Sequence, residues 1–149
     1  MDGNLSEKHL LLLSHLRQNS REKLTIISKK TNIPISTLFD MLKEMQGVLI
    51  TKSTVFIDYA RLGFHTRASI LLRVSASDKE KLQKHLRFHP NINTIYKINN
   101  SWDFLIETIH KNNKELDIFL DQLHRQFQIQ EKQVHYLIDE IKKEESQVW

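Results

Sequence analysis

The hydrophobic and polar positions of the chain follow two different periods, and the change between them comes near residue 48. Up to that point apolar residues recur every three or four positions, which is the spacing of amphipathic helices. Beyond residue 66, apolar and polar residues alternate in short runs separated by helix-like stretches, which is typical of strands and helices that share one sheet. The sequence therefore predicts a helical N-terminal region followed by an α+β region.

Three short helices are predicted in the first fifty residues. Ser6 can cap the first one. The second begins near Leu24 and ends at Asn32, which tolerates a left-handed turn conformation. Pro34 suits the first turn of the third helix, which ends near Gly47. The first helix is expected to have an apolar face of Leu5, Leu12, Leu13 and Leu16. The third is expected to bury a stripe of Ile35, Leu38, Phe39, Leu42 and Met45.

A small hairpin is predicted after the helices, because short β-branched runs flank the polar residues 51–54. Its apolar residues are Val48, Ile50, Val55 and Ile57. A hairpin at this place is the wing of a winged helix-turn-helix. Residues 58–66 have no clear period and are interpreted as a linker. We therefore divide the chain into a winged helix-turn-helix domain at 1–57, a linker at 58–66 and a second domain at 67–149.

The second domain is predicted to have the element order βαββαβ. Strands are expected at 67–74, 92–98, 102–108 and 133–141, with a turn at 99–101 and helices at 78–88 and 115–127. This order is that of the ferredoxin-like fold, in which both helices cover one face of a four-stranded antiparallel sheet.

The other face of this sheet is expected to pack against a second copy of the chain. Leu105 and Ile109 alternate with Phe104 and Ile106, so apolar side chains lie on both sides of this strand and would be exposed in a monomer. We expect a homodimer or a higher oligomer, such as a tetramer or octamer. Candidate interface residues are Tyr96, Phe104 and Tyr136, although alternation alone does not say which face meets the helices. Stacking of these aromatic residues on nucleotide bases is the less favoured alternative.

The stretch between the second and third helices carries the candidate DNA-binding residues. Ser36 and Thr37 have short hydroxyls that can reach phosphates or base edges at the start of the third helix. The candidate phosphate-neutralising side chains are Lys29, Lys30, Lys43 and Lys52. The excess of 22 Lys and Arg over 18 Asp and Glu permits DNA binding without requiring it. A plain three-helix bundle with a solvated charged face is the alternative.

The composition excludes several other chemistries. The absence of cysteine excludes disulfides, thiolate-bound zinc and a cysteine nucleophile, and favours a reducing, cytoplasmic location. The longest apolar run, residues 10–13, is too short for a membrane span, and no secretory signal is expected. His85 and His89 have helical spacing, but Pro90 follows directly, so we interpret them as solvated or structural. No metal, cofactor or enzyme activity is expected.

Two segments carry a family resemblance. Residues 27–37 resemble the helix-turn-helix of the Lrp/AsnC family of feast/famine transcription regulators, and residues 99–105 resemble its Gly-Asp-aromatic-Asp-aromatic hairpin. The likeness extends over about residues 5–142. It implies a sequence-specific regulator that binds double-stranded DNA and oligomerises through its C-terminal domain. It also implies an amino-acid effector at the hairpin, whose positions here are Asn100, Ser101 and Asp103.

The chain departs from this family in two places. The third helix carries Lys43 where the family usually has several arginines, and Asp40 and Glu44 lie beside it. An oligomerisation or effector module with degenerate DNA binding is therefore the alternative function. Asn100 and Ser101 replace a glycine and an acid at the hairpin, so we expect weak or absent amino-acid binding. Relatives of the family include sirohaem decarboxylases, but the sequence offers no positioned acid–base pair.

Overall fold

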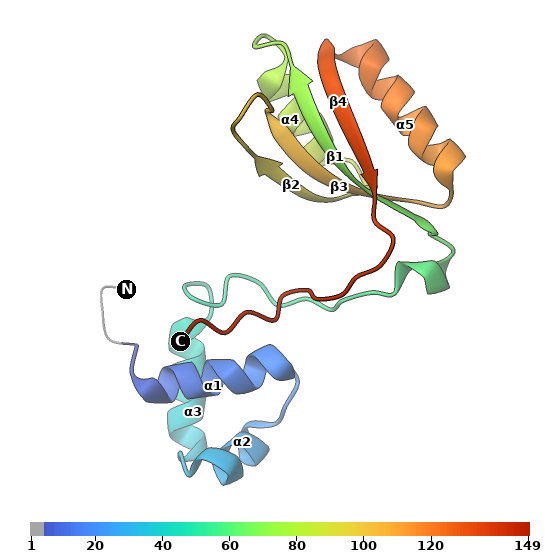
Figure 1. The fold of residues 1–149 in the computed structure, drawn as a ribbon. Helices are drawn as coiled ribbons and strands as arrows, with labels where there is room; N and C mark the ends of the chain where they lie inside the picture. Colours follow the sequence, from blue (N-terminus) through green and yellow to red (C-terminus); the bar gives the residue numbers. More distant parts are fainter. Residues whose placement is uncertain (1–4) are drawn as a thin grey trace. The chain divides into compact units, whose positions relative to one another are not determined.

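The computed structural model describes residues 5–149 and divides the chain into two compact units (Figure 1). The first comprises Met1–Phe56 together with Ile141–Trp149, and we call it the helical unit. The second comprises Ile57–Glu140, and we call it the sheet unit. Residues 1–4 of the predicted N-terminal domain lie outside the described part of the chain.

The helical unit contains the three predicted helices. They are α1 (Glu7–Gln18), α2 (Leu24–Thr31) and α3 (Ile35–Met45). Asn32 ends α2 with a left-handed φ of 57°, as expected. Ser6 occupies the cap position of α1, but its hydroxyl makes no capping bond to the backbone and lies instead 2.8 Å from the His9 Nδ1. The buried core of this unit is Leu12, Ile27, Ile33, Leu38, Met41 and Met45. These side chains come from all three helices and from the turn after α2, so burial of one shared cluster holds the unit together.

Several predicted details of the helical unit are wrong. Ile35 and Phe39 are 47% and 58% exposed, whereas Met41 is buried, so the buried face of α3 is rotated from the expected stripe. Both patterns fit a period of 3.6, and only packing against α1 and α2 decides between them. Leu5 precedes α1 and is 41% exposed.

The wing hairpin does not form. Residues 51–58, all of which the structure describes, contain no strand, and a single bridge joins Gln46 to Ile50. Val55 is 71% exposed. The β-branched residues of this segment therefore lack the partner strand and the apolar surface that would stabilise a two-stranded ribbon.

The end of the chain packs against α1 within the helical unit. The Trp149 indole N–H lies 2.9 Å from the Ser14 Oγ and 3.2 Å from the Leu10 carbonyl oxygen. An Arg17 Nη2 donates to the Ser146 carbonyl at 3.2 Å. No sequence motif indicates these contacts, and they involve residues beyond the strand expected at 133–141.

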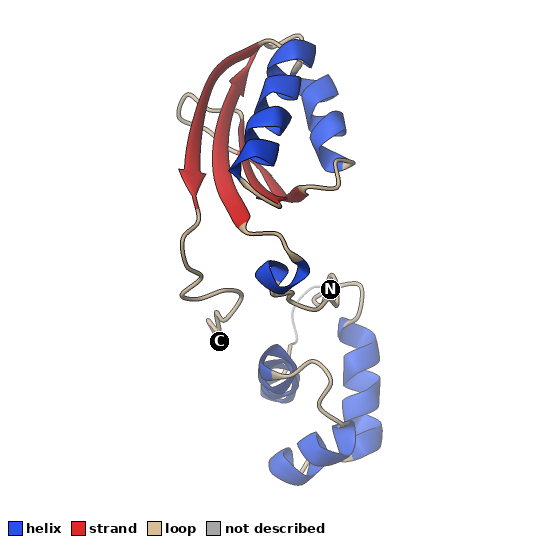
Figure 2. Ribbon diagram, turned by 90° about the vertical axis from the view of Figure 1, so that its right-hand side faces the viewer, coloured by secondary structure: helices blue, strands red, loops and turns tan. Residues whose placement is uncertain are grey.

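The sheet unit has the predicted βαββαβ order. Its elements are β1 (Thr66–Val74), α4 (Lys79–Arg87), β2 (Ile92–Lys97), β3 (Phe104–His110), α5 (Asn113–Gln126) and β4 (Ile129–Tyr136). The strands form one antiparallel sheet in the order β2-β3-β1-β4, and α4 and α5 cover one face of it (Figure 2). A 3₁₀-helix, η1 (Tyr59–Leu62), lies in the segment expected to be a linker.

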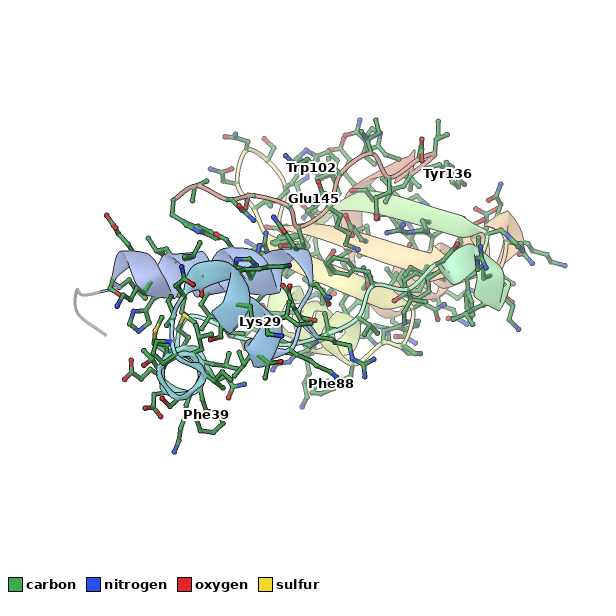
Figure 3. The ribbon with its side chains drawn as sticks, turned by 90° about the horizontal axis from the view of Figure 1, so that it is seen from below. Lys29, Phe39, Phe88, Trp102, Tyr136 and Glu145 are labelled. Atoms are coloured by element: carbon green, nitrogen blue, oxygen red, sulfur yellow. The ribbon has the colours of Figure 1, made fainter. Side chains whose placement is uncertain are left out.

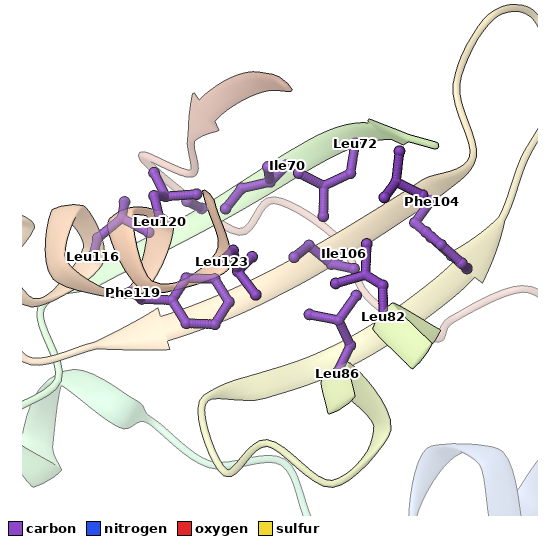
Figure 4. Packing of buried hydrophobic residues seen from close by; sticks show 12 residues of the cluster. Ile70, Leu72, Leu82, Leu86, Phe104, Ile106, Leu116, Phe119, Leu120 and Leu123 are labelled. Carbon is purple, nitrogen blue, oxygen red and sulfur yellow. The ribbon is translucent and has the colours of Figure 1, made fainter. Parts of the chain in front are cut away.

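The core of the sheet unit lies between the sheet and these two helices (Figure 4). Every second residue of β1 is buried, from Thr66 to Val74, which confirms the predicted alternation. The helices contribute mainly leucines to the core. The fully or almost fully buried residues that Figure 4 labels include Ile70, Leu72, Leu82, Leu86, Phe104, Ile106, Leu116 and Leu123.

The last strand begins and ends earlier than predicted. It pairs antiparallel with β1, from Ala68 opposite Tyr136 to Val74 opposite Ile129, so the length of β1 sets its limits. Ile138 and Ile141 lie beyond this pairing and are 98% and 94% exposed. The apolar alternation that predicted a strand to residue 141 therefore continues past the end of the sheet.

Candidate DNA-binding surface, effector hairpin and sheet interface

A tight turn connects α2 to α3. Ile33 is 4% exposed and fixes the turn to the core. The Ser28 hydroxyl donates to the Ile33 carbonyl at 2.6 Å, and the Thr31 hydroxyl donates to the Ile27 carbonyl at 2.7 Å. The Ser28 bond ties α2 to the turn that precedes α3, and the Thr31 bond runs back to a carbonyl four residues earlier in α2. The start of α3 is therefore held at a defined angle to α2, as a helix-turn-helix requires.

The predicted base-reading residues lie near the start of α3. Ser36 is exposed and Thr37 is half-buried. Lys43 is exposed two turns further along the same helix. The opposite side of α3 is held in the core by Leu38, Met41 and Met45. The helix thus presents its short hydroxyls and one ammonium group outward.

The candidate phosphate-binding lysines differ in how free they are. Lys29 is exposed on α2 (Figure 3). Lys30 is bound to Glu22, with 2.5 Å between Nζ and Oε1, and this ammonium lowers the pKa of the Glu22 carboxyl. Lys52 is exposed in the segment that replaces the wing. A lysine already paired with a carboxylate contributes less to phosphate attraction than a free one.

Two carboxylates accompany Lys43 on α3. Asp40 is exposed, and Glu44 Oε2 lies 3.2 Å from the His9 Nε2 of α1. The outward surface of α3 therefore has little positive charge, as the sequence predicts. Any attraction to phosphates must come mainly from α2 and from residues outside α3.

The hairpin between β2 and β3 has its predicted turn. Asn100 and Ser101 both have positive φ, 59° and 75°. Asparagine adopts this region more readily than most residues, whereas serine at positive φ is unusual. The turn that carries a glycine in the resembling family is thus formed here by two residues with side chains.

Asp103 is bonded within the sheet unit. Its Oδ2 accepts the Val74 backbone N–H at 2.9 Å, and its Oδ1 lies 2.9 Å from the Lys79 Nζ. Burial acts to raise the pKa of the Asp103 carboxyl, but the Val74 N–H and the Lys79 ammonium outweigh it and the pKa is lowered. The carboxylate connects the start of β3 to the end of β1 and to α4.

The three predicted interface residues do not share one surface. Tyr96 lies opposite Leu105 on the open face of the sheet and is 56% exposed. Phe104 is 2% exposed in the core under the helices, and Tyr136 lies opposite the core residue Ala68 at the edge strand. The prediction of Phe104 as an interface residue is therefore wrong, because this side chain is buried under the helices. The open face instead brings together Tyr96, Leu105 and Leu71, which is opposite Leu105 in β1.

Three histidines of the sheet unit, His85, His89 and His110, pack on aromatic rings. His89 and His110 lie 4.9 and 5.2 Å from the Phe119 ring, measured between ring centres, and His85 lies 5.7 Å from His89. Among residues 5–149, no group of three or more histidine, aspartate or glutamate side chains is placed to hold a metal ion. No helix in the same range is long and apolar enough to cross a membrane.

The profile of the Lrp/AsnC ligand-binding domain matches residues 67–147, which is more than half of the chain. The chain belongs to the Lrp/AsnC family. The HTH-type transcriptional regulator FL11 of Pyrococcus horikoshii is 29% identical over 104 residues, which are 69% of each chain. This Lrp/AsnC protein is accordingly a DNA-binding transcription regulator.

Solved structures agree with this Lrp/AsnC fold. Bacillus subtilis LrpC aligns with a TM-score of 0.85 at 16% identity and covers 94% of this chain and 99% of its own. A transcriptional regulator of Neisseria meningitidis, solved as an L-Met complex, aligns with a TM-score of 0.87 at 15% identity over 94% of both chains. Both comparisons confirm the predicted α+β fold with an N-terminal helix-turn-helix.

Proposed function

We propose that this Lrp/AsnC regulator binds a pseudo-palindromic DNA site as a dimer, with α3 of each copy in the major groove. The observation that carries the proposal is the turn at residues 32–34, which joins two helices and leaves Ile35 and Ser36 at the start of α3 exposed. In helix-turn-helix proteins the start of the second helix contacts base edges. Ser36 and Thr37 occupy this position.

Phosphate attraction comes from side chains around α3. Three exposed lysines attract phosphates whatever the DNA sequence: Lys29, Lys43 and Lys52. Lys30 also contributes when a phosphate displaces the Glu22 carboxylate from its ammonium group. The two groups of residues have separable effects. Loss of a lysine weakens binding to every DNA sequence, whereas loss of a base contact reduces the ratio of the affinity for the specific site to that for random DNA.

Selection from a random duplex library, followed by salt titration on the enriched site, tests the proposal. Wild-type protein is expected to prefer its site over random DNA by about a thousandfold. Lys29→Ala is expected to weaken both DNAs alike and to reduce the slope of log K against log salt by about one. Thr37→Ala is expected to reduce the preference with an unchanged slope. Failure to enrich any motif would contradict the proposal.

Dimerisation through the open face of the sheet would set the distance between the two reading helices. Leu71 and Leu105 are half-buried neighbours on this face, and Tyr96 extends the apolar surface. Salt bridges from Arg73 to Glu131 and from Arg67 to Glu140 flank it. An apolar centre with a charged rim is typical of a specific interface.

A partner module with weak DNA specificity is the second candidate function. The outward side of α3, with Asp40 and Glu44 beside Lys43, favours it. Such a protein would act by mixed assembly with a related regulator. It would show only salt-sensitive background binding in the library selection, whereas the leading function gives an enriched motif.

An amino-acid effector is the ligand class that the family domain and the L-Met complex of the Neisseria regulator suggest. We infer weak binding or none at the β2–β3 hairpin of this chain. Asn100 and Ser101 supply side chains at the turn, and Asp103 already bonds Val74 and Lys79.

A further inference from the structure

Two large apolar side chains lie in solvent on the outward side of α3. Phe39 is 58% exposed and Ile35 is 47% exposed. They are four residues apart, so they are neighbours on the helix surface and form one apolar stripe. Figure 3 shows Phe39 on the side of α3 away from α1. The stripe begins at the first residue of α3 and adjoins Ser36, so it is continuous with the candidate DNA-binding surface.

The rest of this surface is poor in groups that discriminate bases by hydrogen bonding. Bidentate readout uses arginine or lysine on guanine, and asparagine or glutamine on adenine. The α3 sequence, Ile35–Met45, contains no arginine, asparagine or glutamine, and its single lysine, Lys43, lies near the end of the helix. Besides the short hydroxyls of Ser36 and Thr37, the exposed start of α3 therefore offers a groove mainly the apolar side chains of Ile35 and Phe39.

One feature of the major groove is itself apolar. Thymine presents a C5-methyl group there, which apolar side chains such as phenylalanine contact, and no other standard base does. We propose that Phe39 and Ile35 are specificity-determining residues that read thymine methyl groups in each half-site. This inference rests on the proposed function, because it requires that α3 enter the major groove.

Burial of these side chains against methyl groups would also contribute to affinity. Both are exposed in the free protein, and their contact with thymine methyls would remove water from apolar surfaces on both sides. Removing one buried methyl is expected to weaken binding about fourfold, the factor that corresponds to one buried CH₂ group. The resulting preference is for particular thymines, so the selected site is expected to contain them at fixed positions in both half-sites.

Replacement of thymine by deoxyuridine isolates this interaction, because uracil pairs as thymine does and lacks only the methyl group. The full-length protein is used with the enriched duplex, and each thymine is replaced singly. Kd is measured by fluorescence anisotropy at one salt concentration. Wild type is expected to lose about fourfold in affinity at one or two thymines per half-site. Phe39→Ala is expected to bind the thymine and uracil duplexes equally at one of these thymines, with the salt slope of the wild type.

Two further variants complete the test. Ile35→Ala is expected to lose sensitivity at a different, neighbouring thymine. Phe88→Ala removes another phenylalanine, 74% exposed in the sheet unit, and is expected to retain the full wild-type pattern. Circular dichroism shows whether each variant is folded.

The outcomes separate the inference from the function on which it rests. Equal sensitivity to uracil in wild type and Phe39→Ala, or no sensitivity in wild type, would overturn the inference and leave sequence-specific binding intact. A change in oligomeric state of Phe39→Ala with unchanged uracil sensitivity would assign the stripe to a protein partner instead. Enrichment of no motif would overturn the inference together with the proposed function.

Discussion

Replacement of Asp103 by alanine tests whether this carboxylate stabilises the fold or binds a ligand. The Asp103 side chain is 16% exposed, accepts the Val74 N–H at 2.9 Å and lies 2.9 Å from the Lys79 Nζ. Hydrogen bonds that involve a charged group contribute about 1.5–3 kcal/mol. The Lys79 side chain is 51% exposed, so its ion pair adds at most about 1 kcal/mol. We therefore expect Asp103→Ala to lower the free energy of unfolding by about 2–3 kcal/mol.

Two matched variants divide this effect between the two bonds. Asp103→Asn keeps an oxygen for the Val74 N–H and loses the charge, so it is expected to cost about half as much as alanine. Lys79→Ala keeps the backbone bond and is expected to cost less than about 1 kcal/mol. Both costs are measured by urea unfolding followed by circular dichroism, at one protein concentration because dimerisation contributes to stability.

The Asp103 contribution also has a predicted pH dependence. Its carboxyl pKa is lowered from 3.8, against the effect of burial, by the Val74 N–H and the Lys79 ammonium. The folded state thus favours the ionised form. The stabilisation is complete above the unfolded pKa of about 3.9 and is lost as pH falls through the folded value. The difference between wild type and Asp103→Ala should shrink below pH 4. A difference under about 0.5 kcal/mol at pH 7 would refute the structural role of this carboxylate.

Three other predictions follow from the sheet unit. Burial, and then the charge of a neighbouring histidine, lowers the pKa of His110 and of His89 from 6.5, so the unfolded chain binds protons more readily. Stability should therefore decrease as pH falls below about 6.5, and His110→Phe should flatten this decrease in urea unfolding at pH 5–7. Leu105→Arg should give monomers by light scattering in a dilution series, whereas the exposed-edge variant Lys132→Ala should remain dimeric. Calorimetric titration with the twenty amino acids should show no micromolar binding; a response abolished by Asp103→Ala would show that the hairpin still forms an effector site.

The sheet unit could be predicted from the sequence because its periods are unambiguous. β1 alternates strictly, and only one face of it fits against leucine-rich helices. The end of β4 could not be predicted, because the apolar run Tyr136, Leu137 and Ile138 is equally compatible with a strand that continues and with one that has ended. Pairing with Thr66–Val74 of β1 decides where the strand ends.

The helices and the turn of the helix-turn-helix could be predicted from the sequence, whereas the side chains that α3 exposes could not. Asn32 and Pro34 fix the turn locally, which is why the helix boundaries could be found. Which side of α3 faces outward depends on packing against two other helices, so the helical period alone places Phe39 in the core, whereas the side chain is 58% exposed. Lys30 lies near the end of α2 and pairs with Glu22, which precedes the helix by two residues, and this separation of eight positions matches no sequence motif.

We expect the low positive charge of α3 to make DNA binding depend on the proposed sheet interface. A single helical unit with few free lysines is expected to bind a half-site weakly, with a Kd on the order of 10 µM. In a dimer the second helical unit binds at an effective concentration of about 1 mM, so the full site is bound about a hundredfold more tightly than a half-site. Leu105→Arg, which leaves α3 unchanged, should therefore lose about two orders of magnitude in affinity for the full site and none for an isolated half-site. Anisotropy titrations with the two duplexes measure both values. Equal losses on the two duplexes would show that the variant damages the helical unit, and no loss on either would show that Leu105 does not link the two reading helices.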